Sequence, residues 1–513
     1  MSTSDQHQKF PKTYWREIGF PSFEKLSEDI SVDIAIVGAG ITGISAAYLL
    51  AKEGVKVAII EAGGVLNGTT GHTTAKITAQ HGLFYDELIS HFGEDKARQY
   101  YESNISALEF IQQTSKELGI DCDFSQQDAC IYSTTDQYAE KIDKEWDAYQ
   151  TLGIDGYMAE SIPFPIEIKN ALYMKNQGQY HPLKFMKGLL NEAVKMGCQV
   201  YENTTAMEIE EIESSRPKVV TKDGHRVSAR KVIVASHFPF FDGMGMYFAR
   251  MYAERSYAIG VKTDQEYPGG MYISADDPSR SIRYTPYGEN GEKLLVIGGE
   301  NHRTGTGQDT LTHYNALQQF TKDTFGIDSY SYRWSAQDLK TLDKVPYIGH
   351  ITDNKENILV ATGYKKWGMT TGVLAGHILT DLAMDRENPY KDLYTPSRFK
   401  ADPSLQKAVS YNAAVAGHLL KGKLELVPKD AGDLKNGEGS VVMHNGKRAG
   451  GYRDENGKLY LVDTTCTHLG CECEWNHAEK TWDCPCHGSR FAYSGEVVEG
   501  PALVALKNPL EED

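Results

Sequence analysis

Apolar residues in the first part of the chain form short continuous runs separated by a stretch of helical spacing. Val32–Val37 and Val55–Ile60 are mainly apolar, which is the pattern of buried strands. Between them, Ile44–Glu53 repeats apolar residues at the spacing of an amphipathic helix. This order predicts a β-α-β unit within a buried parallel sheet.

The same two patterns recur and predict the rest of the architecture. Helices are expected at about 84–118, 137–152, 183–196, 308–325 and 371–384. Strands are expected at 219–221, 227–235 and 358–361, with mixed strands over 255–300. From about residue 422, short strands alternate with Gly, Asn and Asp turns, which is typical of an all-β domain.

Composition and charge exclude several classes of protein. At 513 residues the chain has room for about two to four domains. Its net charge of −17 disfavours nucleic acid and anionic membranes as partners. No apolar run is long enough for a membrane span, and the polar N-terminal region does not have the pattern of a signal peptide. Five of the eight cysteines lie between positions 466 and 486, so a disulfide scaffold is not expected and the cytoplasm is the expected compartment.

The turn after the first strand carries a nucleotide-binding pattern. Gly38, Gly40 and Gly43 form GxGxxG between a strand and a helix, and Glu61 ends the second strand. Such glycines allow backbone N–H groups to meet a pyrophosphate at the positive end of the helix, and the acid would accept ribose hydroxyls. A dinucleotide site is therefore predicted, and the pattern alone fits FAD or NAD.

Two short C-terminal segments carry metal-ligand chemistry. They contain a C-x-H pair and a C-x-x-H pair, with fifteen residues between His468 and Cys484. Two thiolates and two imidazoles on adjacent loops are the ligand set of a Rieske [2Fe–2S] centre, in which cysteines hold one iron and histidines the other. Zinc also accepts mixed Cys/His ligands, but it prefers a different spacing and leaves further cysteines unexplained.

The further cysteine in each of the two segments resembles those of the disulfide-containing Rieske proteins of the cytochrome bc complexes. The resemblance implies Cys466, His468, Cys484 and His487 as ligands and a disulfide between Cys471 and Cys486. It also implies that the Ser489 hydroxyl donates a hydrogen bond to the cluster region. The tyrosine that the family often has two residues later is Phe491 here, so a somewhat lower potential is expected. Cys473 is left without a role, as an ordinary surface thiol.

Residues of about 30–400 resemble the D-amino acid oxidase superfamily, in particular its glycine/D-amino acid dehydrogenase branch. The matching segments are Ile34–Gly43, Gln179–Pro182, Asp343–Gly349, and Ala361–Gly363 followed by Gly368–Gly372. The resemblance implies FAD, with Gly363, Gly368, Met369 and Thr370 beside the flavin. It also places Thr69, Thr70 and His72 at the cofactor. In dimethylglycine and sarcosine dehydrogenases a nearby histidine carries the flavin covalently, and His72 is expected either to do so or, preferably, only to line the cofactor.

The whole chain resembles a bacterial family in which a glycine/D-amino acid dehydrogenase-like protein is fused to a Rieske domain. This implies an α/β FAD-binding Rossmann-type domain with an interleaved mixed-sheet substrate domain, followed by an all-β Rieske domain. The expected bounds are an arm at 1–31, the oxidoreductase at 32–400, a linker helix at 401–421 and the Rieske domain at 422–513. Nucleotide-binding parts are expected at about 32–80, 180–240 and 340–390, and substrate parts at about 84–178 and 250–335.

The implied activity is oxidation of a small amine or amino acid at a C–H beside nitrogen, with electrons passed singly through the cluster to an external acceptor. Two alternatives remain: a reductase partner feeds electrons inward for a reduction or hydroxylation, or the protein is a redox sensor. No catalytic base is demanded. Candidate substrate residues are Arg283, Arg303 and Tyr257, with Tyr284 and Lys366 as wall residues. The acids Glu472, Glu474, Glu479 and Asp483 are expected either to dock a basic electron carrier or to form a merely solvated loop.

Overall fold

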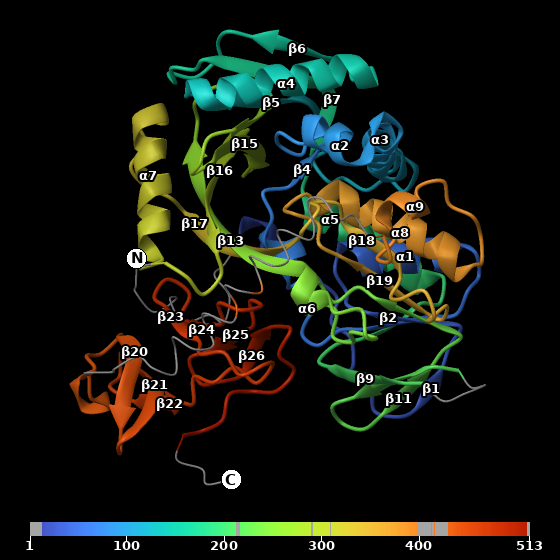
Figure 1. Cartoon of the computed structure of the whole chain (residues 1–513), viewed down its shortest axis with the longest axis vertical. Helices are drawn as coiled ribbons and strands as arrows, with labels where there is room; N and C mark the ends of the chain where they lie inside the picture. The colour runs from blue at the N-terminus through green and yellow to red at the C-terminus, as the bar shows by residue number, and fades with distance from the viewer. Residues whose placement is uncertain are drawn as a thin grey trace.

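The computed structural model describes residues 13–211, 216–288, 291–307, 309–398, 412, 415 and 429–509. Figure 1 shows a large sheet with its helices at the top, a sheet covered by helices at the right, and a small all-β part at the bottom left. Among these described residues, no helix has both the length and the apolar character that crossing a membrane requires.

The six-stranded sheet at the right contains the predicted β-α-β unit. Its order is β18–β19–β12–β2–β3–β8, and every strand is parallel to its neighbours except β18. The strands are β2 (Ile34–Val37), β3 (Val57–Ile60), β8 (Gln199–Tyr201), β12 (Lys231–Val234), β18 (Tyr347–His350) and β19 (Ile358–Thr362). The carboxyl ends of the parallel strands meet at one edge, where open α/β sheets bind their ligands.

Both faces of this sheet are buried, which explains its continuous apolar runs. Ile34 and Ile36 belong to the core shared with α1 (Ile41–Lys52), α5 (Pro182–Lys195) and α8 (Gly368–Ala383). Ala35 and Val37 face a second core, formed with a four-stranded sheet. That sheet consists of β1 (Ile30–Ser31), β11 (Arg226–Ser228), β10 (Lys218–Thr221) and β9 (Ala206–Glu210).

The larger sheet at the top has nine strands in the order β17–β13–β16–β15–β14–β5–β7–β4, with β6 paired to β7. Its strands are β4 (Lys76–Ile77), β5 (Ser125–Ser133), β6 (Gly156–Ala159), β7 (Asn170–Gln179), β13 (Met251–Thr263), β14 (Met271–Ser274), β15 (Arg280–Tyr287), β16 (Glu292–Arg303) and β17 (Tyr332–Thr341). Helix α7 (Leu311–Phe325) packs on β13 and β16, and α4 (Asp136–Leu152) packs on β5 and β7.

Two helices begin or end differently from the sequence expectation. The segment expected as one helix at 84–118 is α2 (Tyr85–Phe92) followed by α3 (Glu94–Glu117), because Gly93 at φ +83° turns the chain between them. Helix α8 begins at Gly368 rather than at Thr371. Glycine is a poor helix former, so the sequence pattern placed it outside the helix.

The N-terminal segment is described from Thr13 onward and is anchored to the cofactor side of the molecule. Trp15, in the short 3₁₀ helix η2 (Tyr14–Glu17), is fully buried, and its Nε1 donates to the Thr73 carbonyl at 2.8 Å. The linker helix expected at 401–421 lies outside the described residues, apart from positions 412 and 415.

The C-terminal part consists of two small antiparallel sheets. One contains β20 (Gly439–His444), β21 (Lys447–Arg453) and β22 (Leu459–Val462). The other contains β23 (Glu474–Asn476), β24 (Thr481–Asp483), β25 (Arg490–Ala492) and β26 (Val497–Glu499). The second sheet lies nearer to the rest of the molecule than the first (Figure 1). Both Cys/His boxes lie in loops that flank it, before β23 and between β24 and β25.

Candidate functional site

A cavity of about 1430 Å³ runs between the three parts of the molecule. This exceeds the roughly 300–1,000 Å³ of a site for one drug-sized ligand, so it has room for a dinucleotide and a small substrate. The six-stranded sheet contributes Gly38, Gly40 and Glu61, and the nine-stranded sheet contributes Tyr257 and Asp338. The C-terminal part closes one side with residues 496–503 and 505.

The glycine loop fits a dinucleotide at the end of the sheet. A Cβ on Gly38 would lie 2.5 Å from the Ala235 carbonyl oxygen, and a Cβ on Gly43 would lie 1.9 Å from the Gly38 oxygen, so neither position accepts a larger residue. Helix α1 therefore begins directly at the cavity, where its first N–H groups favour an anion. Glu61 accepts from Ala39 N at 2.8 Å and Gly63 N at 2.9 Å, which holds its carboxylate at the cavity. Burial raises the pKa of Glu61.

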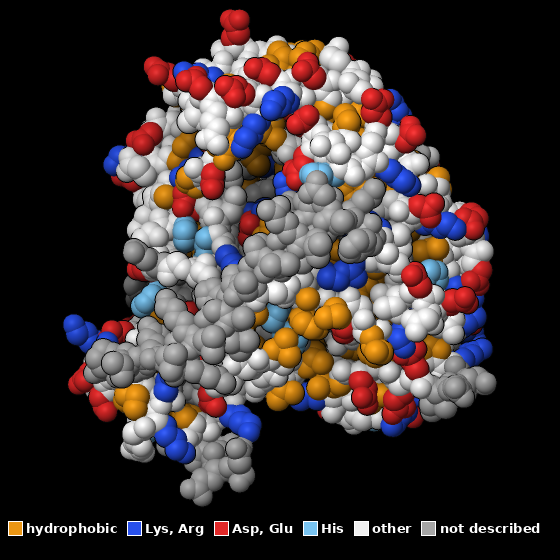
Figure 2. All heavy atoms as spheres, in the orientation of Figure 1, with side chains coloured by type: hydrophobic (Ala, Val, Ile, Leu, Met, Phe, Trp, Pro, Cys, Tyr) orange, Lys and Arg blue, Asp and Glu red, His pale blue; other side chains and the backbone are white. Residues whose placement is uncertain are grey.

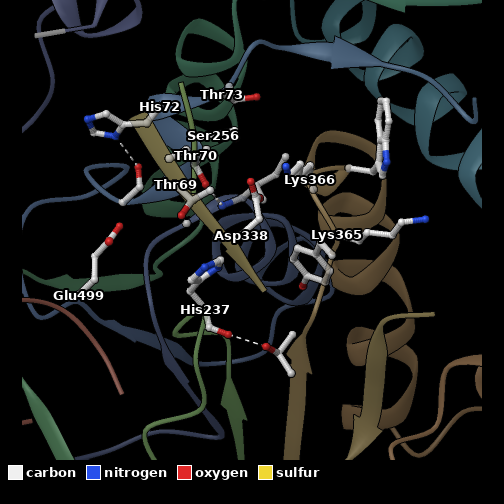
Figure 3. Close-up of a pocket in the computed structure, with 18 of the residues that line it drawn as sticks. Thr69, Thr70, His72, Thr73, His237, Ser256, Asp338, Lys365, Lys366 and Glu499 are labelled. Carbon is white, nitrogen blue, oxygen red and sulfur yellow. Dashed lines mark hydrogen bonds between the residues drawn. The ribbon is translucent and has the colours of Figure 1, made fainter. Parts of the chain in front are cut away.

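The segment Thr69–His72, which forms η3, lines the cavity and contacts the start of α1 beside the glycine loop. Thr70 Oγ1 accepts from Ile41 N at 3.1 Å, and Thr69 Oγ1 donates to the Gln337 carbonyl at 3.2 Å. His72 is buried, and its Nδ1 lies 2.9 Å from the Gly68 carbonyl oxygen. In Figure 3 its imidazole points away from Asp338 and Lys366. Burial lowers the pKa of His72, so the ring is neutral at pH 7.

The loop between β19 and α8 brings two lysines to the cavity. Lys365 and Lys366 are non-glycine residues at φ +50° and +75°, a strained conformation that clusters at functional sites. Lys366 Nζ lies 3.4 Å from Glu254, and burial lowers the pKa of Lys366 to about 8. Gly368 and Met369 line the cavity. Gly363 and Thr370 do not: Gly363 packs against Thr341, and Thr370 Oγ1 donates to the Thr78 carbonyl.

The substrate side of the cavity carries both signs of charge. Asp338 of β17 lies near His237 and Lys366 in Figure 3, and burial raises the pKa of its carboxyl. Lys76 is buried, and its ammonium donates to Ser281 Oγ. Burial and the nearby Arg283 lower the pKa of Lys76 to about 7. Tyr257 lines the same wall, and its hydroxyl lies 2.9 Å from His302 Nε2.

The two arginines expected at the substrate lie elsewhere. Arg283 is fully buried outside the cavity lining, and its guanidinium donates to the carbonyls of Tyr284, Thr74, Ala75 and Tyr180. Arg303, at the end of β16, also lies outside the lining. Burial, together with the positive charge of Arg303, lowers the pKa of His487 of the C-terminal part. Tyr284 does not line the cavity, whereas Lys366 does.

The structure brings the C-terminal Cys/His boxes together. The sulfur atoms of Cys466, Cys473 and Cys484 lie within 4.8 Å of one another, and the ring centroids of His468 and His487 are 5.0 Å apart. Cys471 and Cys486 form the disulfide that the resemblance implies, joining the two loops. Thiolates grouped beside a pair of imidazoles fit a [2Fe–2S] cluster with mixed ligands.

Ser489 and Cys473 belong to the same two loops and lie beside the other thiols. Ser489 is fully buried and lies within hydrogen-bonding reach of Cys466, while its Oγ accepts from Ala502 N at 3.0 Å. Cys473 was expected at the surface but is fully buried beside the other thiols. The segment Glu472–Glu474 pairs with Thr464 and Thr465 of the same loop. The polar residues on either side of Cys473 did not indicate this pairing.

The cysteine/histidine loops pack directly on the nine-stranded sheet. A Cβ on Gly305, at φ +68°, would lie 2.5 Å from Pro485 N, and one on Gly488 would lie 2.5 Å from Ala253 Cβ. Gln337 Nε2 donates to the Gly488 carbonyl at 2.9 Å. Gly305 thus meets the backbone of the second loop and Gly488 meets the side chains of Ala253 and Gln337, at distances that leave no room for a Cβ.

Buried charges close the same interface. Glu499 Oε2 lies 2.9 Å from Arg255 Nη2 of β13 and 2.9 Å from Arg490 Nη1. Arg490 also lies 3.1 Å from Asp483 Oδ1. These arginines hold the pKa of Glu499 down to about 2 despite its burial.

The acidic segment proposed as a docking tip is mostly part of this interface. Glu472, Glu479 and Asp483 are buried, and only Glu474 is exposed. Tyr314 of α7 donates to Glu479 Oε1 at 2.8 Å, and Asp483 pairs with Arg490. The expectation of a charged surface for a basic carrier, or of a solvated loop, is therefore wrong for these three acids.

The structure also reveals cavity residues that sequence reasoning missed. Lys76 lies on β4, far in the chain from Trp334 and Asp338 on β17, and no local pattern marks them. His237 could have been found, because it closely follows buried strand β12 at the ligand-binding edge of the parallel sheet.

Comparison with known proteins gives matches for both halves. Residues 33–382 match the family described as FAD dependent oxidoreductase, and residues 426–509 match the Rieske [2Fe-2S] domain. The putative Rieske 2Fe-2S iron-sulfur protein YhfW of Bacillus subtilis (strain 168) is 52% identical over 507 residues, covering 98% of this chain and 99% of that protein.

Two further relatives match the oxidoreductase part. The gamma-glutamylputrescine oxidoreductase of Escherichia coli (strain K12) is 25% identical over 380 residues, covering 71% of this chain and 86% of that protein. The crystal structure of glycine oxidase from Geobacillus kaustophilus aligns with a TM-score of 0.61 at 20% identity, covering 72% of this chain and 99% of that one. This last likeness shows a shared fold.

Proposed function

We infer that this chain, which belongs to the FAD dependent oxidoreductase family and ends in a Rieske [2Fe-2S] domain, is a dehydrogenase of small amines or amino acids. It oxidises a carbon next to nitrogen and passes the electrons singly to its own [2Fe–2S] cluster, and from there to an external one-electron acceptor. Two similar proteins, a gamma-glutamylputrescine oxidoreductase and a glycine oxidase, are named for nitrogen-bearing compounds, which supports a substrate of this class.

One observation carries the proposal: the dinucleotide cavity and the Cys/His loops share a wall. His237 lines the cavity, and the next residue, Phe238, has its ring centroid 6.2 Å from that of His468. The C-terminal part also lines the cavity with residues 496–503 and 505. An arrangement in which both redox sites meet inside one chain favours internal electron transfer over separate roles.

The cofactors supply the redox chemistry, and the protein supplies position and charge. Bound FAD accepts an electron pair and can release it in single steps, while a Rieske cluster accepts one electron at a time. Converting the C–H and N–H of an amine to an imine releases two electrons and two protons, so two molecules of a one-electron acceptor are needed for each turnover. No side chain is required to break the C–H bond, and binding residues set the geometry.

We propose that Lys76 binds a substrate carboxylate, in place of the arginines expected from the sequence. Its ammonium is buried at the substrate wall beside Ser281, and no carboxylate partner of Lys76 is present among the described ion pairs. Burying a cation without a counter-charge is costly, and an anionic substrate group would offset that cost. Asp338, on the same cavity, is the matching partner for a substrate nitrogen.

Anaerobic mixing tests the proposed activity. The full chain, loaded with FAD and cluster, is mixed with a panel of D-amino acids, N-methyl amino acids and small amines. We expect at least one compound to bleach the flavin absorbance and then produce the EPR signal of the reduced cluster. If no compound does so, while a reductase reduces the cluster first and the flavin afterwards, electrons run inward and the dehydrogenase proposal fails.

We further propose Cys466, His468, Cys484 and His487 as the cluster ligands. Replacing any one of them by alanine should abolish the Rieske EPR signal, whereas Cys473→Ala should keep it. Stoichiometric zinc without iron in the purified protein would refute the assignment.

For His72 we propose contact without a covalent bond, so acid precipitation should leave the yellow colour in the supernatant; colour retained in the pellet would refute this.

A further inference from the structure

Two aromatic rings of the oxidoreductase part contact the proposed histidine ligands. Phe238 lies 6.2 Å from His468, and Phe248 of α6 (Tyr247–Arg250) lies 5.8 Å from His487 and 6.4 Å from His468, centroid to centroid. All of these pairs meet edge to face, a favourable geometry for aromatic rings. The two phenylalanines therefore cover the imidazole edge of the cluster site.

The chain reaches this position through a strained turn at the end of β12. His237 has φ +65°, in the left-handed region that is costly for a non-glycine residue. Three hydrogen bonds hold the turn: Thr362 Oγ1 donates to His237 O at 2.6 Å, Ser236 Oγ donates to Phe238 O at 2.9 Å, and Phe240 N donates to Ser236 Oγ at 3.3 Å.

The turn brings two adjacent residues to the cavity. His237 projects into the cavity beside Asp338 (Figure 3), and its Nε2 has no hydrogen-bond partner within the described part of the protein. Phe238 also lines the cavity, is 8% exposed, and packs toward His468. Phe238 therefore contacts the cavity and the proposed histidine ligand at the same time.

We propose that Phe238 is the contact through which electrons pass between the flavin cavity and the [2Fe–2S] cluster. The inference rests on the proposed function and names the residue that links its two redox sites. One electron leaves the reduced flavin and one oxidised cluster is reduced in each transfer, and the substrate supplies the pair. Electron transfer weakens steeply with any unfilled gap, so a packed ring at this position is favourable.

A competing connection runs through Gln337. Thr69 donates to the Gln337 carbonyl, and the Gln337 amide donates to the Gly488 carbonyl next to His487. This link also joins a cavity segment to a ligand loop, but through two hydrogen bonds, one donated by the Thr69 hydroxyl and one by the Gln337 side-chain amide. Gln337→Leu therefore separates the two routes, since it leaves Phe238 untouched.

Flash photolysis measures the transfer without knowledge of the substrate. A photoreduced 5-deazaflavin reduces the bound FAD of the full, loaded chain anaerobically, and loss of the oxidised-cluster absorbance reports the internal transfer rate. Phe238→Leu should slow this rate several-fold, and Phe238→Trp should restore much of it. The midpoint potentials and the EPR spectrum should stay unchanged, which separates a bridging role from a damaged cluster.

Phe241→Leu is the matched control, since it makes the same substitution on the same loop. Its ring faces Lys355 and Gly243 rather than the histidines, so the wild-type rate is expected. If Phe238→Leu does not retain its cluster, Phe238→Met makes the same comparison with a flexible apolar chain.

The outcomes distinguish this inference from the proposed function. Wild-type transfer rates in the Phe238 variants would overturn the inference alone, and a slow Gln337→Leu variant would then assign the second route. Absence of any transfer from flavin to cluster in the wild-type chain would instead refute the internal electron transfer on which both depend.

Discussion

Replacing Glu499 by glutamine should loosen the C-terminal domain from the oxidoreductase part. Glu499 is the shared partner of Arg255 on β13 and Arg490 on β25, at 2.9 Å from each. Arg255 is 1% exposed, so the substitution leaves a buried guanidinium with its Ser335 hydrogen bond but without its ion-pair partner. Uncompensated buried charge is among the largest single causes of destabilisation.

Two routes give a similar magnitude for this change. The two arginines lower the pKa of Glu499 from 4.5 to about 2, and at about 1.4 kcal/mol per pH unit the difference corresponds to about 3 kcal/mol. Removing one partner of a buried ion pair typically costs about 3–5 kcal/mol. We therefore expect Glu499→Gln to lower the free energy of unfolding by about 3 kcal/mol at neutral pH.

Urea unfolding, followed by the visible circular dichroism of the cluster, measures the loss in free energy of unfolding of the C-terminal domain. The control is Glu496→Gln, an exposed acid three positions earlier, which should change the free energy by less than about 0.5 kcal/mol. Because the folded pKa of Glu499 is depressed, its contribution is present above pH 4.5 and is lost as pH falls toward 2. The gap between wild type and variant should shrink in that window. If wild type and Glu499→Gln have equal free energies of unfolding at neutral pH, the ion pairs of Glu499 do not stabilise this domain.

Three further substitutions test the site. Ser489→Ala should lower the cluster midpoint by about 40 mV, the equivalent of one hydrogen bond of about 1 kcal/mol, in an EPR-monitored titration, and an unchanged midpoint would show that Ser489 does not interact with the cluster. Lys76→Met should abolish the flavin spectral change on titration with acetate, which in the wild type weakens as pH rises through about 7 and the ammonium loses its proton; pH-independent binding would exclude Lys76. Gly305→Ala, with its Cβ against Pro485, should lower the urea midpoint of the cluster signal by more than Gly307→Ala, whose Cβ would meet only His302 Nδ1 at 3.9 Å; equal effects would argue against the close contact.

The features predicted well from the sequence are those whose determinants lie close together in the chain. Gly38, Gly43 and Glu61 act within one β-α-β unit, so their spacing carries the geometry. The Cys/His boxes are likewise short, and the two loops they form do meet. The spacing of residues within one short segment is therefore enough to indicate such a site, even when the rest of the fold is unknown.

What the sequence could not predict depends on contacts between distant segments. The charges of Arg283 and Glu479 look available in the sequence, yet tertiary packing gives the first to backbone carbonyls and the second to Tyr314. Cys473 is fully buried, with Cys484 of the other loop among its neighbours. Lys76 and Asp338 converge on the cavity from β4 and β17, which are 260 residues apart and on different parts of one sheet. No pattern in either strand marks such a pair.

The hydrophobic surface around α6 bears on the last step of the proposed reaction. Figure 2 shows apolar side chains gathered there, and Met244 and Met246, directly before α6, are 90% and 54% exposed. Leu469, next to His468, is also half exposed. Electrons that reach His468 are therefore close to the protein surface, which is compatible with release to a separate carrier.

Outward electron flow is tested by an anaerobic redox titration of the full chain, with flavin absorbance and the Rieske EPR signal followed together. We expect a cluster midpoint clearly above that of the flavin, so that electrons run outward from an amine substrate. A cluster midpoint below that of the flavin would contradict it and reverse the direction of flow.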